Sequence, residues 1–238
     1  MNILALDTAT EACSVAIQYK TEQSHIFSVS PQQHSQLIID RVDELLTAAN
    51  TDIQNMGLLA FARGPGSFTG VRIATGVIQG FAMATGKPVV AISTLAIMAQ
   101  QAFMTEQQER VIAAIDARMG EVYFAIFEVD HYGIMQLVGD EAVLPPEIAR
   151  QQIDEYIAEH GSAFIVGTGW QAYAEQLLLP DERDLLNAAS IDILYPNALY
   201  MLPLAKAAAQ AKQTVPADRI EPVYLRDKVT WKKLPGRE

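Results

Sequence analysis

The sequence predicts an α/β protein built from two lobes. Three β-rich segments open the chain, and helical and strand patterns alternate after them. A charged stretch at Thr105–Arg110 then interrupts the apolar pattern, and a second series of strand and helix patterns follows it. With 238 residues, half of them hydrophobic, the chain can bury one sizeable core or two smaller ones.

The first lobe is expected to span residues 1–105. Its predicted strands are Ile3–Leu6, Ser14–Tyr19, His25–Val29, Leu58–Phe61 and Val89–Ile92. Its predicted helices are Ser35–Ala49, Phe68–Thr85 and Thr94–Phe103. A three-strand meander followed by helix, strand, helix, strand and helix is the order of the ribonuclease H-like unit in actin, sugar kinases and Hsp70 chaperones. We therefore expect an actin-like fold.

The second lobe is expected over residues 106–196. Its predicted elements are the strands Val111–Ala114, Val122–Phe127, Met135–Val138 and Ala163–Val166, and a helix at Pro145–Ala158. The segment Asp116–Glu121 is either a hairpin turn held by an Asp–Arg pair or a polar edge facing the interlobe cleft, and its glycine favours the turn. An alanine-rich run, Ala198–Lys212, predicts a last helix that joins the first lobe.

The charge is unevenly distributed along the chain. The net charge is −11. Residues 219–238 hold six basic and three acidic side chains, so this tail carries +3 and the preceding residues carry −14. Because an acidic body repels phosphate backbones, a plain RNA-binding module is disfavoured unless a basic partner is present. The basic tail either is solvated or contacts RNA or an acidic partner.

The cysteine, histidine and serine residues of the sequence form no catalytic or metal-binding motif. The single cysteine, Cys13, excludes an internal disulfide and is expected to pack inside a strand. His25, His34, His131 and His160 lack the spacing of a helical metal site. No nucleophile elbow surrounds any serine. No apolar run reaches the length of a membrane span, and we expect a cytoplasmic protein.

A glycine-rich turn, Arg63–Gly70, joins a predicted strand to the long helix that begins near Phe68. Its backbone N–H groups either meet an anion at the helix N-terminus or pack closely against another backbone segment. Ser67 or Thr69 is expected to cap the helix. The spacing matches neither the Walker nor the dinucleotide-binding fingerprint.

The first predicted strand ends at Asp7 and leads into a small polar turn. In actin-like folds such a turn faces nucleotide phosphates and metal, but an aspartate at a strand end also commonly caps a turn. Both interpretations stay open. The residues of a possible residual nucleotide or anion site are Asp7, Thr8, Gly64, Gly66 and Ser67.

The predicted helix Phe68–Thr85 has one face that is almost bare of side chains, because Gly76, Gly80 and Ala84 recur every four residues. Glycine within a helix costs about 1 kcal/mol relative to alanine, and close backbone approach would compensate for this cost. The face packs either on the protein's own sheet or on a partner.

Four segments resemble the TsaB family, also called YeaZ. They are Ile3–Ile17, Gly64–Gly86, Ile115–Tyr123 and Pro222–Arg226. The resemblance implies a two-lobed relative of the transferase TsaD that is not itself catalytic. It implies a heterodimer with TsaD, joined by the ATPase TsaE, that forms threonylcarbamoyladenosine at adenosine 37 of tRNAs reading codons that begin with A. It also implies a homodimer when the chain is alone, and contact with tRNA only through the complex.

The resemblance also points to particular residues. TsaD-like proteins carry a His-x-x-x-His metal pair, and the matching positions here are Thr94 and Met98. The partner surface is expected on the helices near Ser35 and Phe68. Its expected residues are Leu37, Ile38, Val42, Leu45, Phe68, Arg72, Gly76, Gly80 and Phe81. The rival functions are an actin-like small-molecule kinase or ATPase that uses Asp7 and Arg63–Gly70, and a peptidase.

Overall fold

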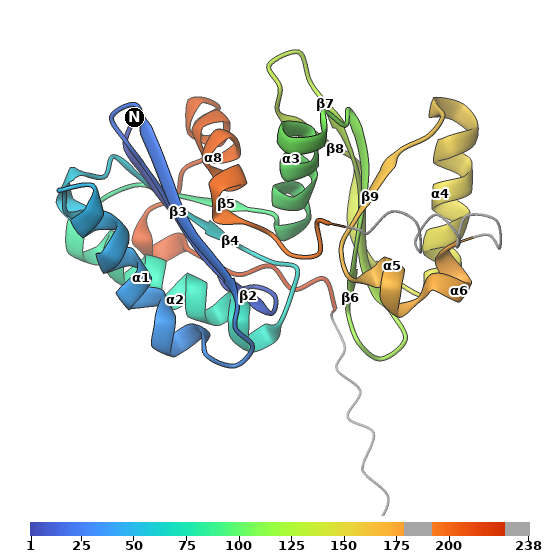
Figure 1. Ribbon diagram of the computed structural model, residues 1–238, viewed down its shortest axis with the longest axis horizontal. Coiled ribbons are helices and arrows are strands. Elements are labelled where there is room, and N and C mark those ends of the chain that lie inside the picture. The colour runs from blue at the N-terminus through green and yellow to red at the C-terminus, as the bar shows by residue number, and fades with distance from the viewer. Residues whose placement is uncertain (179–191, 227–238) are drawn as a thin grey trace, which may run out of the picture.

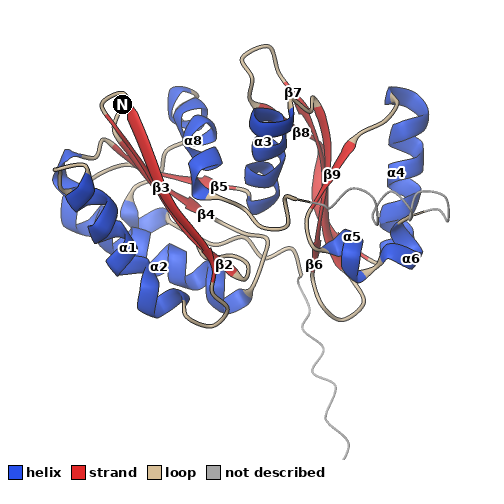
Figure 2. Cartoon of the chain, in the orientation of Figure 1, coloured by secondary structure: helices blue, strands red, loops and turns tan. Residues whose placement is uncertain are grey.

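The structure, a computed structural model, describes residues 1–178 and 192–226. The expected basic tail therefore lies outside the described residues from position 227 onward. Two β-sheets stand apart, with helices α3 (Thr94–Glu106) and α8 (Met201–Gln210) between them (Figure 1). Further helices cover the outer face of each sheet, which gives alternating helical and sheet layers (Figure 2).

The first sheet has five strands in the order β3-β2-β1-β4-β5. Their bounds are β1 Ile3–Asp7, β2 Ala12–Tyr19, β3 Glu22–Val29, β4 Leu58–Ala62 and β5 Val89–Ile92. β1 to β3 form an antiparallel meander, whereas β4 and β5 run parallel to β1. This is the order of the ribonuclease H-like unit, as the sequence predicts.

Both faces of the first sheet are covered. Leu4 and Leu6 pack toward α1 (His34–Ala48) and α2 (Phe68–Thr85). Ile3 and Ala5 pack on the opposite face, with side chains of α3 and α8. Burial on both faces explains why β1 and β4 are apolar along their whole length, whereas the edge strand β3 is mostly polar and exposed.

The second sheet has four strands in the order β8-β7-β6-β9. Their bounds are β6 Arg110–Asp116, β7 Val122–Val129, β8 Met135–Leu144 and β9 Phe164–Val166. α3 packs on one face through Leu95, Met98, Ala99 and Ala102. The other face is covered by α4 (Pro146–His160), α5 (Gly169–Ala172) and α6 (Ala174–Leu177). α3 thus contributes to the cores of both lobes.

The predicted strands and long helices all form, with shifted ends. β8 continues from the predicted end at Val138 to Leu144, and the last helix divides into a 3-10 turn at Ala198–Tyr200 and α8. α5 and α6 were not predicted, because each is a single turn whose pattern is too short to detect. No helix in the described ranges is both long and apolar enough to cross a bilayer.

Candidate partner-binding site

The glycine-rich turn packs tightly against the turn between β1 and β2. A Cβ atom on Gly66 would lie 2.2 Å from the Ala9 carbonyl oxygen, and one on Gly70 would lie 2.0 Å from that of Thr8. The Thr8 hydroxyl donates to the Gly70 carbonyl oxygen at 2.6 Å, and the Ser67 N–H donates to the Ala9 carbonyl oxygen at 2.7 Å. Close backbone approach is therefore sufficient to explain both glycines.

The outer side of the same turn is covered by the C-terminal segment. The Val223 N–H donates to the Arg63 carbonyl oxygen at 2.8 Å. Gly64 has a φ of +102°, and a Cβ there would lie 2.9 Å from the Val223 carbonyl oxygen. The turn is thus held between two backbone segments. That it also binds an anion or nucleotide remains a prediction.

Asp7 is completely buried at the end of β1. Its Oδ1 accepts the Ala9 N–H at 2.6 Å, which closes the turn as one of the two interpretations of the sequence predicts. Its Oδ2 has no hydrogen-bond partner among the described residues. Burial raises the pKa of Asp7 from 3.8 to about 7, with the Ala9 hydrogen bond opposing this shift. A large share of the Asp7 side chains is therefore uncharged at neutral pH.

Helix α2 presents two different faces. Its buried face, including Ala74 and Ile78, packs on the first sheet. Ser67 caps its first turn, since the Ser67 hydroxyl accepts the Gly70 N–H at 3.4 Å. The opposite face is open to solvent.

The open face of α2, which we call the α2 stripe, consists of Phe68, Arg72, Gly76, Gly80 and Met83. Phe68 is 58% exposed and Met83 is 74% exposed. A Cβ atom on Gly76 or Gly80 would meet no atom within 4 Å. The bare face predicted from the glycine spacing is therefore not used for packing within the described chain.

Helix α1 lies beside α2, and its apolar stripe is part of the core. Ile38, Val42 and Leu45 are 0%, 3% and 5% exposed, and they pack against the first sheet. Their assignment to a partner surface is therefore corrected, because their side chains have almost no free area. Leu37 and Phe81 are partly buried against the same core.

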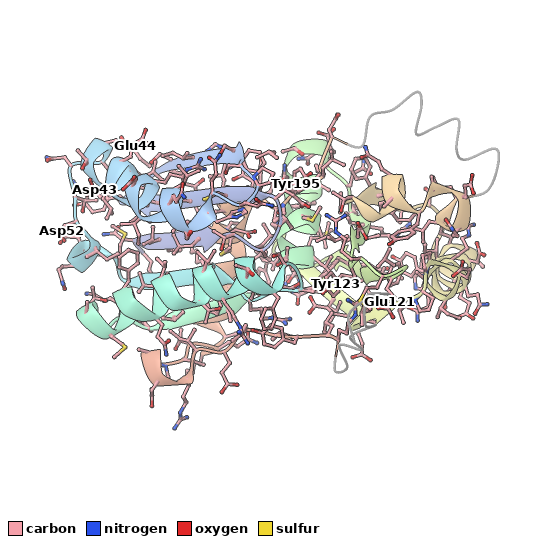
Figure 3. All side chains as sticks on the ribbon, turned by 90° about the horizontal axis from the view of Figure 1, so that it is seen from below. Asp43, Glu44, Asp52, Glu121, Tyr123 and Tyr195 are labelled. Carbon is pink, nitrogen blue, oxygen red and sulfur yellow. The ribbon has the colours of Figure 1, made fainter. Side chains whose placement is uncertain are left out.

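The exposed side of α1 is acidic with one apolar residue. Asp40, Asp43 and Glu44 are exposed there, together with Ile39, which is 47% exposed. Figure 3 shows α1 and α2 side by side, with Asp43 and Glu44 on α1 and Asp52 near the same end.

An aromatic clamp holds Arg72 at the first turns of α2. The Arg72 Nε donates to the Tyr224 hydroxyl oxygen at 2.8 Å. The guanidinium carbon lies 3.7 Å from the centroid of the Phe68 ring and 5.7 Å from that of Tyr224. Stacking and the hydrogen bond together fix the direction of this cation on the surface.

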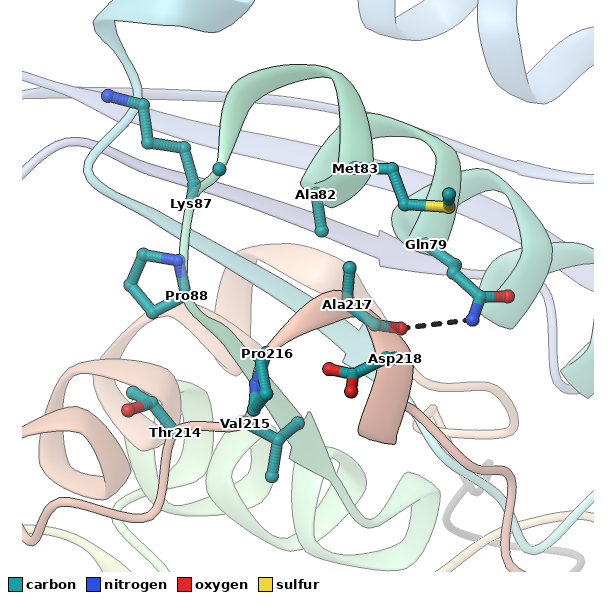
Figure 4. Close-up of a pocket in the computed structure, with 11 residues that line it drawn as sticks. Gln79, Ala82, Met83, Lys87, Pro88, Thr214, Val215, Pro216, Ala217 and Asp218 are labelled. Atoms are coloured by element: carbon teal, nitrogen blue, oxygen red, sulfur yellow. Dashed lines mark hydrogen bonds between the residues drawn. The ribbon is translucent and has the colours of Figure 1, made fainter.

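A groove of about 820 Å³ lies at the other end of α2. It is lined by Gln79, Ala82, Met83, Gly86, Lys87, Pro88 and residues 214–218 (Figure 4). The Gln79 side-chain amide donates to the Ala217 carbonyl oxygen at 2.9 Å, which ties the 214–218 segment to α2.

Ion pairs connect the first and second lobes at their interface. Arg63 Nη2 lies 2.8 Å from Glu141 Oε2 on β8, and Arg118 Nη2 lies 3.2 Å from Glu11 Oε1. Arg226 of the C-terminal segment pairs with Glu121, which directly precedes β7 of the second lobe and is labelled beside Tyr123 in Figure 3. Arg118 also pairs with Asp116 at 3.0 Å. The predicted hairpin turn is therefore present, and its arginine also reaches the other lobe.

The two positions that match the metal-binding histidine pair of TsaD-like proteins are buried. Thr94 and Met98 are both 0% exposed, and Met98 packs among the apolar side chains between α3 and the second sheet. No three His, Cys, Asp or Glu side chains converge as metal ligands in the part of the chain that the structure describes.

Two residues at the α2 stripe, Met83 and Tyr224, were not predicted from the sequence. Met83 follows Gly80 by three residues, so the helical period could have placed it on the same face. Tyr224 lies 152 residues from Arg72, and no local pattern signals that contact.

The fold and the surface define an actin-like protein of two lobes, with a tightly packed glycine turn and an open small-residue helix face. The chain matches the family model TsaD, tRNA N6-adenosine threonylcarbamoyltransferase, over residues 26–234. It is 45% identical to the tRNA threonylcarbamoyladenosine biosynthesis protein TsaB of Haemophilus influenzae, over 100% of this chain and 99% of that protein. It is 44% identical to the protein of the same description from Escherichia coli, over 100% of both.

Solved structures agree with these relatives. YeaZ from Pseudomonas aeruginosa is 40% identical with a TM-score of 0.79, covering 94% of this chain and 99% of that one. A second structure is described as an uncharacterized protein with similarity to peptidase YeaZ from Pseudomonas aeruginosa. It is 42% identical with a TM-score of 0.84, over 94% of this chain and 99% of that one. The chain belongs to the TsaB family, within the broader TsaD family.

Proposed function

We propose that this chain is a non-catalytic partner of a TsaD transferase in the biosynthesis of tRNA threonylcarbamoyladenosine. Its full-length relatives are named for this pathway. In this proposal the chain forms a heterodimer with TsaD, the ATPase TsaE joins the pair, and tRNA is contacted through the complex. In this proposal the chain acts in the cytoplasm.

The observation that carries the proposal is the α2 stripe. A Cβ atom on either Gly76 or Gly80 would meet no atom within 4 Å, although each helical glycine costs about 1 kcal/mol relative to alanine. Exposed Phe68 and Met83 lie at the two ends of the stripe. A second protein backbone that packs against Gly76 and Gly80 would explain both features, as would a second copy of this chain when TsaD is absent.

The closed core around Thr94 and Met98 supports a role other than metal-dependent transfer. A catalytic metal needs ligands and an open coordination position. Thr94 and Met98 offer neither, because both are fully buried and Met98 lies among apolar groups.

The interface is tested by mixing this chain with the TsaD protein of the same organism and measuring the mass and affinity of the complex. Leucine at Gly80 should weaken the complex at least about tenfold, because its side chain would hold the two backbones apart. Gln151→Leu places the same side chain on an exposed position of α4 and should leave the affinity unchanged. Circular dichroism confirms that each variant is folded.

The assigned role is tested by a tRNA modification assay from which each subunit is omitted in turn. Omission of this chain should abolish modification, and this chain alone should modify no tRNA. Modification by the isolated chain, or normal modification without it, would refute the proposal. ATP turnover by the purified chain would instead favour the small-molecule kinase or ATPase function.

A further inference from the structure

Arg72 has an unusual position on the α2 stripe. It is the only charged residue among the eighteen residues of α2. It is exposed, and no carboxylate among the described residues pairs with it. A single cation therefore stands on a face that otherwise has small, apolar or aromatic side chains.

The guanidinium is held in place before any partner arrives. Tyr224 accepts the Arg72 Nε–H, and the Phe68 ring lies under the guanidinium carbon. A free arginine side chain loses rotamer entropy when a partner fixes it, and this clamp has already removed part of that freedom. The side chain is thus preorganised for recognition.

The recognition groups of Arg72 remain unused. Only Nε has a hydrogen-bond acceptor among the described residues, so the two terminal nitrogens are available. Their planar fork matches the two oxygens of a carboxylate. When a partner covers the α2 stripe, it removes water from this cation, and a desolvated cation is stable only with a counter-charge and hydrogen bonds.

We propose that Arg72 is an anchor that receives a carboxylate of an Asp or Glu side chain from the TsaD partner, with Phe68 and Tyr224 as positioning residues. This inference rests on the proposed function and names the chemistry of the same surface. A polyanion such as RNA is the less suitable occupant, because residues 1–218 carry a net charge of −14. Arginine with aromatic neighbours is also the composition of interface hot spots.

The test measures the affinity of this chain for TsaD with three variants. Arg72→Lys keeps the charge but loses the fork and the stacking, and it should weaken binding at least about tenfold. Tyr224→Phe keeps the ring but removes the acceptor of Nε, and it should weaken binding by a smaller factor. In the double variant the effect of Tyr224→Phe should vanish, because the two residues act as one unit.

The matched control is Lys20→Gln. Lys20 is another exposed cation that lies over an aromatic ring, 5.1 Å from the centroid of Tyr19, but it is remote from α2 along the chain. Its removal should leave the affinity unchanged. A loss as large as that of Arg72→Lys would show that the affinity also responds to changes far from the α2 stripe, and it would overturn the anchor.

The remaining outcomes distinguish the possible occupants. If wild-type chain binds TsaD and Arg72→Lys binds equally well, the anchor is refuted while the proposed function stands. If wild-type chain fails to bind TsaD, the proposed function itself fails. An Arg72-dependent change in self-association alone would assign the carboxylate to a second copy, whose α1 exposes Asp40, Asp43 and Glu44. Arg72-dependent binding of inorganic phosphate by the isolated chain would also overturn the assignment to a partner carboxylate.

Discussion

At the scale of single residues, two kinds of glycine occur within one helix. Gly70 lies in the first turn of α2, where a Cβ would meet the Thr8 carbonyl oxygen at 2.0 Å. Gly76 lies six residues later, where a Cβ atom would meet nothing within 4 Å. The same residue type therefore fulfils a packing requirement at one position and leaves a surface bare at the other.

Gly70→Ala should destabilise the chain by about 3 kcal/mol or more, because the obstacle is backbone rather than a flexible side chain. Urea denaturation of both proteins measures the difference. An unchanged unfolding midpoint would show that the β1–β2 turn does not constrain this residue.

Asp7 should make stability depend on pH. Its pKa is about 7 in the fold and 3.8 in the unfolded chain, so the folded state binds the Asp7 proton more tightly than the unfolded chain does. The free energy of unfolding should therefore fall as pH rises from about 4 to about 7, by roughly 2–4 kcal/mol, and the full penalty is present above that range.

Asp7→Asn should remove most of this pH dependence. The amide oxygen can still accept the Ala9 N–H, but the side chain no longer carries a charge that burial penalises. Denaturation curves at several pH values would check this, and an identical pH slope in wild type and variant would contradict it.

At the scale of elements, α2 combines a conventional buried face with a stripe that its own fold does not use. Gly76→Ala should therefore stabilise the isolated chain by about 1 kcal/mol, because alanine has the higher helix propensity and its methyl group meets nothing. Thermal unfolding measures this effect. A destabilised variant would mean that an unseen neighbour already occupies the stripe.

Helix α1 shows that helical periodicity predicts an apolar face but not the surface that this face contacts. The spacing of Ile38, Val42 and Leu45 correctly indicates one apolar face of α1. It does not say which surface that face meets. The first sheet is the nearer apolar surface, so these side chains entered the core, and Ile39 and the acidic residues were left outside.

At the scale of the whole molecule, the two lobes are connected by ion pairs as well as by helix α3, which packs in the cores of both. The Arg63–Glu141 pair is the less exposed of these contacts, with side chains 24% and 7% accessible. Glu141→Gln should destabilise the protein by about 1–3 kcal/mol, because Arg63 then keeps its charge in a partly desolvated place without a counter-ion.

The stability of Glu141→Gln should be compared with that of Glu11→Gln. The Glu11 pair is the control, because its Arg118 partner is 75% exposed and surface pairs contribute little. Equal losses in the two variants would show that burial does not distinguish these interlobe contacts.

The order of strands and helices could be predicted from the amino-acid pattern, because each element carries its own periodicity and its own stop signals. This pattern also marked the strand–glycine turn–helix unit and the small-residue face of α2. It could not decide whether Gly66 and Gly70 approach an anion or a backbone, since that depends on the Thr8 and Ala9 carbonyl oxygens from another part of the chain.

Which side chains are free to meet a partner depends on the packing of the whole chain. This packing buries Ile38, Val42 and Leu45, leaves Gly76 and Gly80 open, and brings Tyr224 to Arg72 across 152 positions. Local patterns record only which face of an element is apolar. What that face touches is set by long-range packing, in which every element competes for the same core.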